Sequence, residues 1–295
     1  MCKKNDKSGR SVSRVYQNSV YQKGKDIRKD FYVSQKSGDI QKNLCVSQKS
    51  EDIQKDFFEI IGDQYLLHYN DHYSRIYRER FIYKPMVQNI NLEGKIVLDA
   101  MCGSGQISEF VTQERCELHG LDISDKQIEL YRRRFPDADS YVRSILDTGF
   151  PDSFFDVVLM CGGLHHVHPN ENQTVREIHR LLKPGGFFVF AEPHANTVVD
   201  NARRFWYAAD HFFMSNESAV DYVVLEKNFV GLFDTVNVKY FGNIAYYLIY
   251  NSLILRIPLR VKKIIAPFAL FLESKLLPLH THFMSSYLVA QWQKK

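Results

Sequence analysis

The segment 97–105, which reads VLDAMCGSG, constrains the fold of this chain more than any other feature. Its apolar start and the acid Asp99 are typical of a buried strand that ends at a ligand site. Gly103 and Gly105 then predict a turn, and residues 106–113 continue as a helix. Because glycine has no Cβ, such a turn lets the backbone approach a ligand closely. Strand–turn–helix units of this kind usually bind adenosine cofactors.

Two acidic residues distinguish between the possible cofactors. A dinucleotide-binding turn needs a third glycine or alanine, where this chain has Ser108. Asp99 would repel a pyrophosphate, but it suits the ammonium and sulfonium groups of S-adenosylmethionine. Asp122 ends the next expected strand, 122 − 99 = 23 residues later, where a carboxylate can accept both ribose hydroxyls. The combination therefore predicts an S-adenosylmethionine site.

The charge of the chain is distributed unevenly. Its 295 residues allow one large domain with an appendage. Residues 1–55 carry 13 Lys and Arg against 6 Asp and Glu, a net charge of +7, whereas the remainder carries 25 against 28, a net of −3. The almost neutral body argues against nucleic acid as a partner.

Cysteine usage indicates a reducing compartment. The five cysteines are odd in number, and their spacing suggests neither a disulfide framework nor a zinc site. The N-terminus has no apolar secretory segment. We therefore expect a cytoplasmic location, with the inner face of the membrane as an alternative location.

The first 55 residues read as a flexible basic arm. Copies of a 13-residue repeat begin at Gln22, Gln35 and Gln48, and successive copies would rotate around a helix rather than share a face. A recent tandem duplication explains them, although an interaction arm for an acidic partner or an anionic membrane is the sharper alternative. We expect the folded domain to span residues 56–295.

Strands and helices alternate through the middle of the chain, which predicts a parallel sheet covered by helices on both faces. The expected strands are 95–100, 117–122, 140–143, 156–161 and 187–191, and the expected helices are 106–113, 125–134 and 172–182. An aromatic-rich helical segment, 57–82, precedes them.

The pattern changes after residue 192. Residues 196–230 read as a helical lid, and strands are expected at 235–241 and 286–292. Between these strands lies an apolar insertion, 243–283. The longest uncharged run there, 241–255, has 15 residues, whereas a membrane-spanning helix needs about 20. We interpret the insertion as an apolar cap over the active site, with a helix lying on the membrane surface and ordinary core packing as alternatives.

The chain resembles a class I S-adenosylmethionine-dependent methyltransferase, in particular the small-molecule enzymes of the ubiquinone/menaquinone-methyltransferase type. The resemblance covers residues 56–193 and 286–292. It rests on VLDAMCGSGQ (97–106), LHGLDIS (118–124), GFPDSFFDVVLMCGGLHHV (149–167) and LLKPGGFFVFAEP (181–193). These motifs are specific for the superfamily but not for the methyl acceptor. The resemblance implies a doubly wound, seven-stranded, mostly parallel Rossmann-like sheet with an antiparallel last strand, so the insertion falls between strands six and seven.

The resemblance also assigns cofactor contacts. The methionine end of the cofactor would lie against Asp99 through Gly105, and Asp122 would bind the ribose while Ile123 packs on the adenine. The family usually has Gly-Asp where this chain has Arg143-Ser144, so Ser144 or Asp147 would replace the adenine acceptor. The expected cofactor residues are Asp99, Ala100, Met101, Cys102, Gly103, Ser104, Gly105, Asp122, Ile123, Ser144, Ile145, Cys161 and Gly162.

Two histidines are the candidate catalytic bases. His165 and His166 follow the strand 156–161 at the carboxyl edge of the expected sheet, where ligands of such folds bind. Histidine titrates near neutrality, so either could remove a proton from a hydroxyl, and either could instead brace the loop. His168 completes a cluster of three histidines, but no neighbouring carboxylate or cysteine completes a ligand set, so we expect no metal. For substrate contacts we expect Tyr73, Tyr77 and His194.

The sequence thus predicts a methyltransferase acting on a small-molecule, lipid-linked or glycan-linked acceptor, with oxygen as the favoured atom. The alternatives are a catalytically silent protein that kept the cofactor fold, motivated by Arg143-Ser144, and a peripheral membrane adaptor that uses the arm and the insertion. A nicotinamide dehydrogenase fits worse, because the third glycine is absent.

Overall fold

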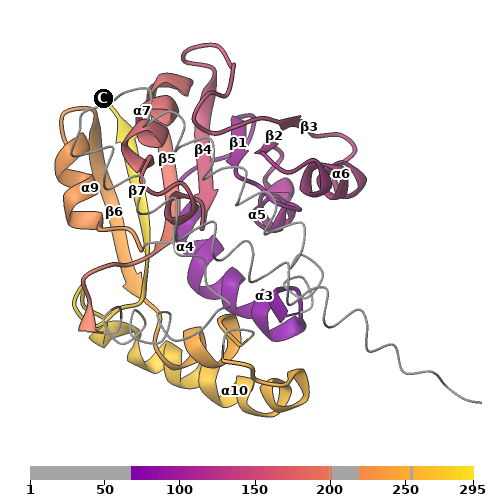
Figure 1. The fold of residues 1–295 in the computed structure, drawn as a ribbon, viewed down its shortest axis with the longest axis vertical. Coiled ribbons are helices and arrows are strands. Elements are labelled where there is room, and N and C mark those ends of the chain that lie inside the picture. Colours follow the sequence, from indigo (N-terminus) through magenta and orange to yellow (C-terminus); the bar gives the residue numbers. More distant parts are fainter. Residues whose placement is uncertain (1–67, 199, 201–218, 253–254) are drawn as a thin grey trace, which may run out of the picture.

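A seven-stranded sheet forms the centre of the protein. The computed structural model describes residues 68–198, 200, 219–252 and 255–295. The strand order is β3-β2-β1-β4-β5-β7-β6, and β7 is antiparallel to both of its neighbours, as expected from the sequence (Figure 1). The strands are β1 (Ile96–Ala100), β2 (Glu117–Asp122), β3 (Asp139–Val142), β4 (Phe155–Cys161), β5 (Leu182–Pro193), β6 (Phe233–Phe241) and β7 (Tyr287–Lys294).

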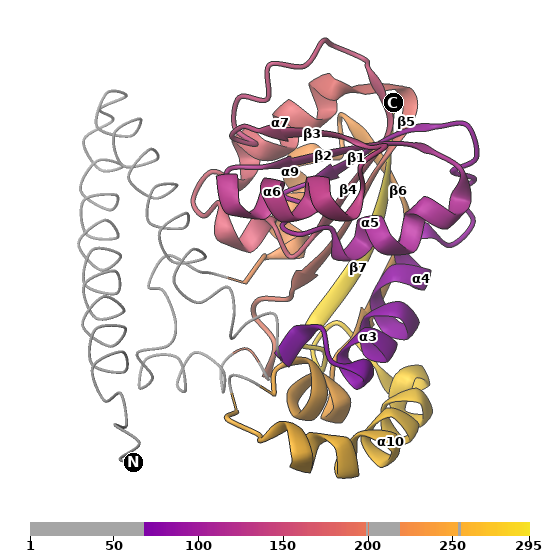
Figure 2. The ribbon, with the colours of Figure 1, turned by 90° about the vertical axis from the view of Figure 1, so that its right-hand side faces the viewer.

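Helices cover both faces of the sheet (Figure 2). Because successive strand side chains point to opposite faces, Val97 packs in one core cluster and Leu98 in the other. The first cluster also holds apolar residues of α3 (His72–Arg78), α4 (Lys84–Val87), α5 (Gln106–Val111), α6 (Asp125–Arg134) and α10 (Leu259–Leu276). The second holds those of α7 (Glu171–Leu181) and α9 (Tyr222–Phe229). The doubly wound architecture is confirmed.

Some boundaries differ from the sequence expectation. Strand β5 begins at Leu182 rather than at residue 187, because Leu182 pairs with Phe155 and the ammonium of Lys183 lies 2.8 Å from Asp156 Oδ2. Helix α3 starts at His72, where the carboxylate of Asp71 accepts the N–H of Tyr73 at 3.0 Å, and residues 68 and 69 before it are also helical. A π-helical turn, Glu79–Tyr83, continues it.

Parts of three expected segments lie outside the described residues. These are the arm 1–55, the residues 57–67 of the N-terminal helix, and most of the expected lid. Within 196–230 the structure describes 196–198, 200 and 219–230, and there α9 is helical as expected.

The insertion 243–283 contains a π-helical turn, Tyr246–Tyr250, and the 18-residue helix α10. It follows the end of β6 and lies beside α3, below the carboxyl ends of the parallel strands (Figures 1 and 2). In the part of the chain that the structure describes, no helix has the length and apolar character needed to cross a membrane.

Two buried charges attach α10 to the body. The ammonium of Lys262, 1% exposed, forms an ion pair with Asp71 and donates to Ser74 Oγ at 2.6 Å and to the carbonyl of His68 at 2.8 Å. The carboxylate of Glu273, 0% exposed, accepts backbone N–H groups of residues 242, 243 and 245 at 2.9–3.1 Å. Each charge is compensated by several partners, as burial requires.

Replacing Lys262 with methionine removes these donors and leaves Asp71 without its ion pair. We expect the Lys262→Met variant to lose about 1–3 kcal/mol of unfolding free energy, measured by urea denaturation. The exposed neighbour provides a matched control, because Lys263→Met should change stability little. Equal losses in the two variants would contradict the attachment of α10 through Lys262.

Candidate functional site

The loop between β1 and α5 carries an open backbone surface. Met101, Gly103 and Gly105 have φ angles of +57°, +52° and +83°, in the left-handed region. The N–H of Gly103 donates to Asp122 Oδ2 at 2.9 Å. A Cβ at Gly103 would meet only two glutamine side-chain oxygens, at 3.6 and 3.8 Å. This glycine therefore leaves room for a ligand, in accordance with the expectation.

Gly105 is required for a different reason from the one that the sequence suggests. A Cβ there would lie 2.3 Å from Phe135 Cε2 and 3.0 Å from the ring of Tyr131. Both rings belong to the end of α6, and Tyr131 also packs within 2.6 Å of the Cβ position of Gly120. The second glycine thus admits aromatic side chains of the protein itself.

Asp99 lies beneath this loop and is 1% exposed. Its Oδ2 accepts the hydroxyl of Ser108 at 2.6 Å, and Ser108 Oγ lies 2.9 Å from Tyr131 Oη. Burial raises the pKa of Asp99 to about 7, the hydrogen bond from Ser108 opposes the rise, and the charge of Asp122 adds to it. A cation bound near this carboxylate would be stabilised by it.

Asp122 joins the loop after β1 to the loop after β2. Besides Gly103, it accepts the N–H of Ser124 through Oδ1 at 2.9 Å. Burial raises its pKa, while the hydrogen bonds from Ser124 and Gly103 and the charge of His166 act to lower it. Each carboxylate oxygen keeps a further lone pair for a ligand hydroxyl.

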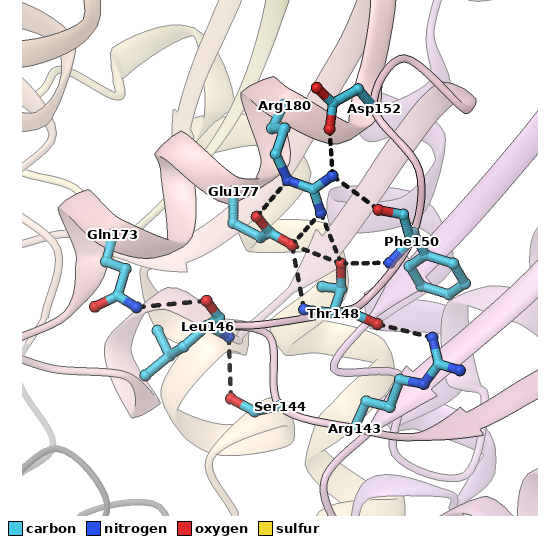
Figure 3. Close-up of polar contacts among 9 residues, drawn as sticks. All are labelled: Arg143, Ser144, Leu146, Thr148, Phe150, Asp152, Gln173, Glu177 and Arg180. Atoms are coloured by element: carbon cyan, nitrogen blue, oxygen red, sulfur yellow. Dashed lines mark hydrogen bonds and ion pairs between the residues drawn. The ribbon is translucent and has the colours of Figure 1, made fainter. Parts of the chain in front are cut away.

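The loop after β3 is anchored by helix α7 (Figure 3). Glu177 Oε1 accepts the hydroxyl of Thr148 at 2.6 Å, and Arg180 donates to both oxygens of Glu177 at 2.7 and 2.8 Å. Burial acts to raise the pKa of Glu177, but the hydrogen bonds from Arg180 and Thr148 outweigh it and lower the pKa. This anchor was not identified from the sequence, because its members are about 30 residues apart.

Arg143 and Ser144 have local structural partners. The Arg143 guanidinium lies 4.9 Å from the ring centre of Tyr141 and 5.3 Å from that of Phe150, and it donates to the carbonyl of Thr148 at 2.9 Å (Figure 3). Ser144 Oγ accepts the N–H of Leu146 at 3.0 Å. The basic residue that departs from the family pattern therefore contacts two aromatic rings of its own domain.

His165 is paired with a buried carboxylate. Its Nδ1 lies 2.8 Å from Glu192 Oε2, and Glu192 is 0% exposed at the end of β5. Glu192 also accepts the N–H groups of Gly163 and Leu164 at 2.8 Å. A carboxylate can only accept, so Nδ1 carries the proton and the lone pair is on Nε2. The sequence alone did not predict this pair, because its members are 27 residues apart.

The other expected residues fall into different surroundings. His166 stacks against His165 with ring centres 3.9 Å apart. His194, 1% exposed, has its Nε2 3.2 Å from His282 Nδ1, and burial lowers its pKa. Tyr77 is fully buried against Phe81, and its hydroxyl has no hydrogen-bond partner among the described residues.

Three further expected residues are Tyr73, Cys161 and Gly162. Tyr73 is half-buried on α3. Cys161 ends β4 and Gly162 follows it. Burial raises the pKa of the Cys161 thiol, which keeps it neutral. Gly162 has a φ of +73°, and a Cβ there would lie 3.6 Å from the hydroxyl of Tyr287. Among the described residues, no group of three or more His, Cys, Asp or Glu side chains is placed to hold a metal ion.

Comparisons with known proteins find methyltransferases that resemble part of this chain. The methyltransferase domain family matches residues 98–190. An uncharacterized methyltransferase from Synechocystis is 34% identical over 118 residues, which are 39% of this chain and 55% of that protein. Phthiotriol/phenolphthiotriol dimycocerosates methyltransferase from Mycobacterium tuberculosis is 30% identical over 40% of this chain and 45% of that protein. Demethylmenaquinone methyltransferase from Listeria welshimeri is 33% identical over 32% of this chain and 43% of that protein. The chain thus matches about half the length of these relatives.

Solved structures share the fold at low identity. The MccD protein superposes with a TM-score of 0.50 and 18% identity over 73% of this chain and 97% of that chain. The [4+2]-cyclase SpnF gives a TM-score of 0.50 and 18% identity over 72% of this chain and 79% of that chain. Since one of these proteins is a cyclase, the shared fold alone does not fix the reaction.

Gly94 serves as a control for the steric crowding at Gly105. Gly94 also has a positive φ, +68°, but nothing lies within 4 Å of its Cβ position. We expect Gly105→Ala to cost about 1–3 kcal/mol more unfolding free energy than Gly94→Ala, because it adds overpacking to the same backbone strain. Urea denaturation measures both, and adding Phe135→Leu should recover part of the loss only at Gly105. Equal losses would contradict the packing argument.

The raised pKa of Asp99 predicts a pH-dependent stability. Between the unfolded value of 3.8 and the folded value of about 7, the folded protein binds more protons, so this residue lowers stability as pH rises and then levels off above 7. Without ligand, Asp99→Asn should therefore melt higher than the unmodified protein at pH 8, by about 2–4 °C for each kcal/mol regained. The difference should shrink at pH 5. Melting curves with the same pH dependence in both proteins would contradict the raised pKa.

Proposed function

We propose that this chain is a class I S-adenosylmethionine-dependent methyltransferase that transfers a methyl group from this cofactor to a hydroxyl oxygen. The match of residues 98–190 to the methyltransferase domain family supports the assignment. The acceptor class is a small molecule or a lipid-linked or glycan-linked compound. Two relatives are named for lipid and quinone acceptors, which supports this class. The observation that carries the choice of oxygen is the pair His165–Glu192, because a hydroxyl must lose a proton when it is methylated.

The cofactor assignment uses the two carboxylates of the edge. Asp122 would bind the ribose with the lone pairs that remain after its contacts to Gly103 and Ser124. Asp99, with its pKa raised by burial, would regain a favourable environment for its charge beside a cationic ligand. The open surface at Gly103 would face the methionine end, and the adenine would pack on Ile123 near Ser144 and Ile145.

The proposed step needs one base and an aligned pocket. The acceptor oxygen attacks the methyl carbon, the carbon–sulfur bond breaks, and its electron pair stays on sulfur to give S-adenosylhomocysteine. The hydroxyl proton moves to Nε2 of His165. Glu192 stabilises the resulting imidazolium and fixes the ring, as the carboxylate partner of a catalytic histidine does. The remaining rate gain comes from holding the three atoms in line in a dry site.

The two adjacent histidines allow a matched test. We expect His165→Gln to lower kcat by about 10²–10⁴-fold with little change in cofactor affinity, since a general base contributes this much. We expect His166→Gln to keep most of kcat and to change cofactor affinity instead, because the charge of His166 acts on Asp122. Turnover of methyl-labelled cofactor with lipid extracts, hydroquinones and glycan fractions as acceptors measures kcat, and calorimetry measures affinity.

The pH profile adds a readout that a structural role would not move. The acid limb of the kcat profile reports the titration of the base, so it should disappear in His165→Gln. A variant that keeps full kcat would exclude His165 as the base. Absence of cofactor binding by the unmodified protein would instead support a catalytically silent protein.

A further inference from the structure

Helix α10 buries two of its charged side chains and exposes three of its large apolar side chains. Lys262 and Glu273 are buried at 1% and 0% exposure, whereas Ile264, Phe268 and Phe271 are 79%, 66% and 55% exposed. A surface helix in water normally buries its apolar stripe and exposes its charges. The three apolar side chains lie at spacings of four and three residues, so they share one face of the helix. We call them the apolar face of α10.

Among the described residues, the exposed charged side chains of the insertion 243–283 are all positive. Between residues 243 and 283 the sequence holds one acid, Glu273, and that carboxylate is buried on backbone N–H groups. The basic residues Arg260 and Lys263 on α10 and Lys275 near its end are exposed. Apolar side chains flanked only by cations suit a surface that is both apolar and anionic.

We propose that the apolar face of α10 docks on an anionic lipid bilayer. The helix cannot span the bilayer, so it would lie in the interface plane. A second copy of the chain fits worse, because a two-fold contact would place the same cations opposite each other. The arm 1–55 also fits worse as a cover, because it carries a net charge of +7.

The position of α10 gives this docking a consequence for the substrate. Asp122 ends β2, Glu192 lies at the end of β5 and His165 follows β4, so all three lie at the carboxyl edge of the parallel strands. Figures 1 and 2 show α10 below this edge. Lys262 and Glu273 fix it to the body, so the lipid surface would lie at a set orientation to the site. If the proposed methyl transfer is correct, the acceptor is a lipid-soluble compound taken from the bilayer.

The test is sedimentation of the full chain with vesicles, without cofactor. One set of vesicles contains phosphatidylglycerol and phosphatidylcholine, and the other contains phosphatidylcholine alone. The test variant is Ile264→Glu with Phe268→Glu. The control is Val224→Glu with Val230→Glu, which changes two valines that are 52% and 61% exposed at α9, on the far side of the sheet. All four positions are exposed, so the variants should fold, and melting curves check this.

We expect the unmodified protein and the α9 control to bind the anionic vesicles equally, and the α10 variant to bind at least tenfold more weakly. Raising the salt concentration should weaken binding. Replacing Arg260 and Lys263 with glutamate should weaken it by about fivefold per replaced base. Equal binding of the α10 and α9 variants would overturn the proposal, as would equal binding of the unmodified protein to neutral vesicles. If the unmodified protein and the α9 control form a dimer without lipid and the α10 variant is a monomer, the apolar face of α10 would instead bind a second copy of the chain.

The outcome is separable from the proposed function. Vesicle binding needs no cofactor and no acceptor, so it can succeed while methyl transfer fails. Conversely, methyl transfer to a soluble acceptor with vesicle binding unchanged by the α10 variant would keep the enzyme and remove the docking face.

Discussion

The buried contact between Asp99, Ser108 and Tyr131 holds the cofactor edge of this protein together. Asp99 lies in β1 next to its last residue, Ser108 lies in α5 and Tyr131 lies in α6, so one hydrogen-bonded network joins three elements. The ring of Tyr131 also fills the space that a Cβ would need at Gly105 and Gly120. One tyrosine side chain thereby contacts the loop after β1, strand β2 and helix α5. Because this hydrogen-bonded network is buried, each of its three side chains depends on the other two for its hydrogen bonds.

Carboxylates anchor the other loops of the same region. Asp122, Glu192 and Glu273 each accept two or more backbone N–H groups of a loop or turn. Loops at the end of a parallel sheet have backbone groups that no strand satisfies, and a buried acid supplies the missing acceptor. At Glu192 the same carboxylate also orients His165, so the structural and the proposed catalytic roles share one side chain.

The family match and the apolar insertion occupy different parts of the chain. Residues 98–190 carry the match, whereas α10 and its contacts to α3 lie outside it. The shared domain therefore accounts for the loops that would hold the cofactor. Segments outside the match, such as α10, are where we expect selectivity for an acceptor to arise.

Local patterns in the sequence predicted the strands and the glycine turn at 103–105, with the acids at positions 99 and 122 near strand ends, because short apolar runs and glycine geometry act within a few residues. The seven-stranded, mostly parallel sheet with an antiparallel last strand was implied by the resemblance to the family, whereas the strand order is known only from the structure. Only the tertiary structure decided that Gly105 admits aromatic rings, that Glu192 pairs with His165, and that Lys262 is bound to Asp71 across 191 residues of sequence. These partners lie on neighbouring strands or packed helices and are far apart along the chain, so no local pattern records them. The burial that shifts the pKa of Asp99 likewise exists only once the helices close over the sheet.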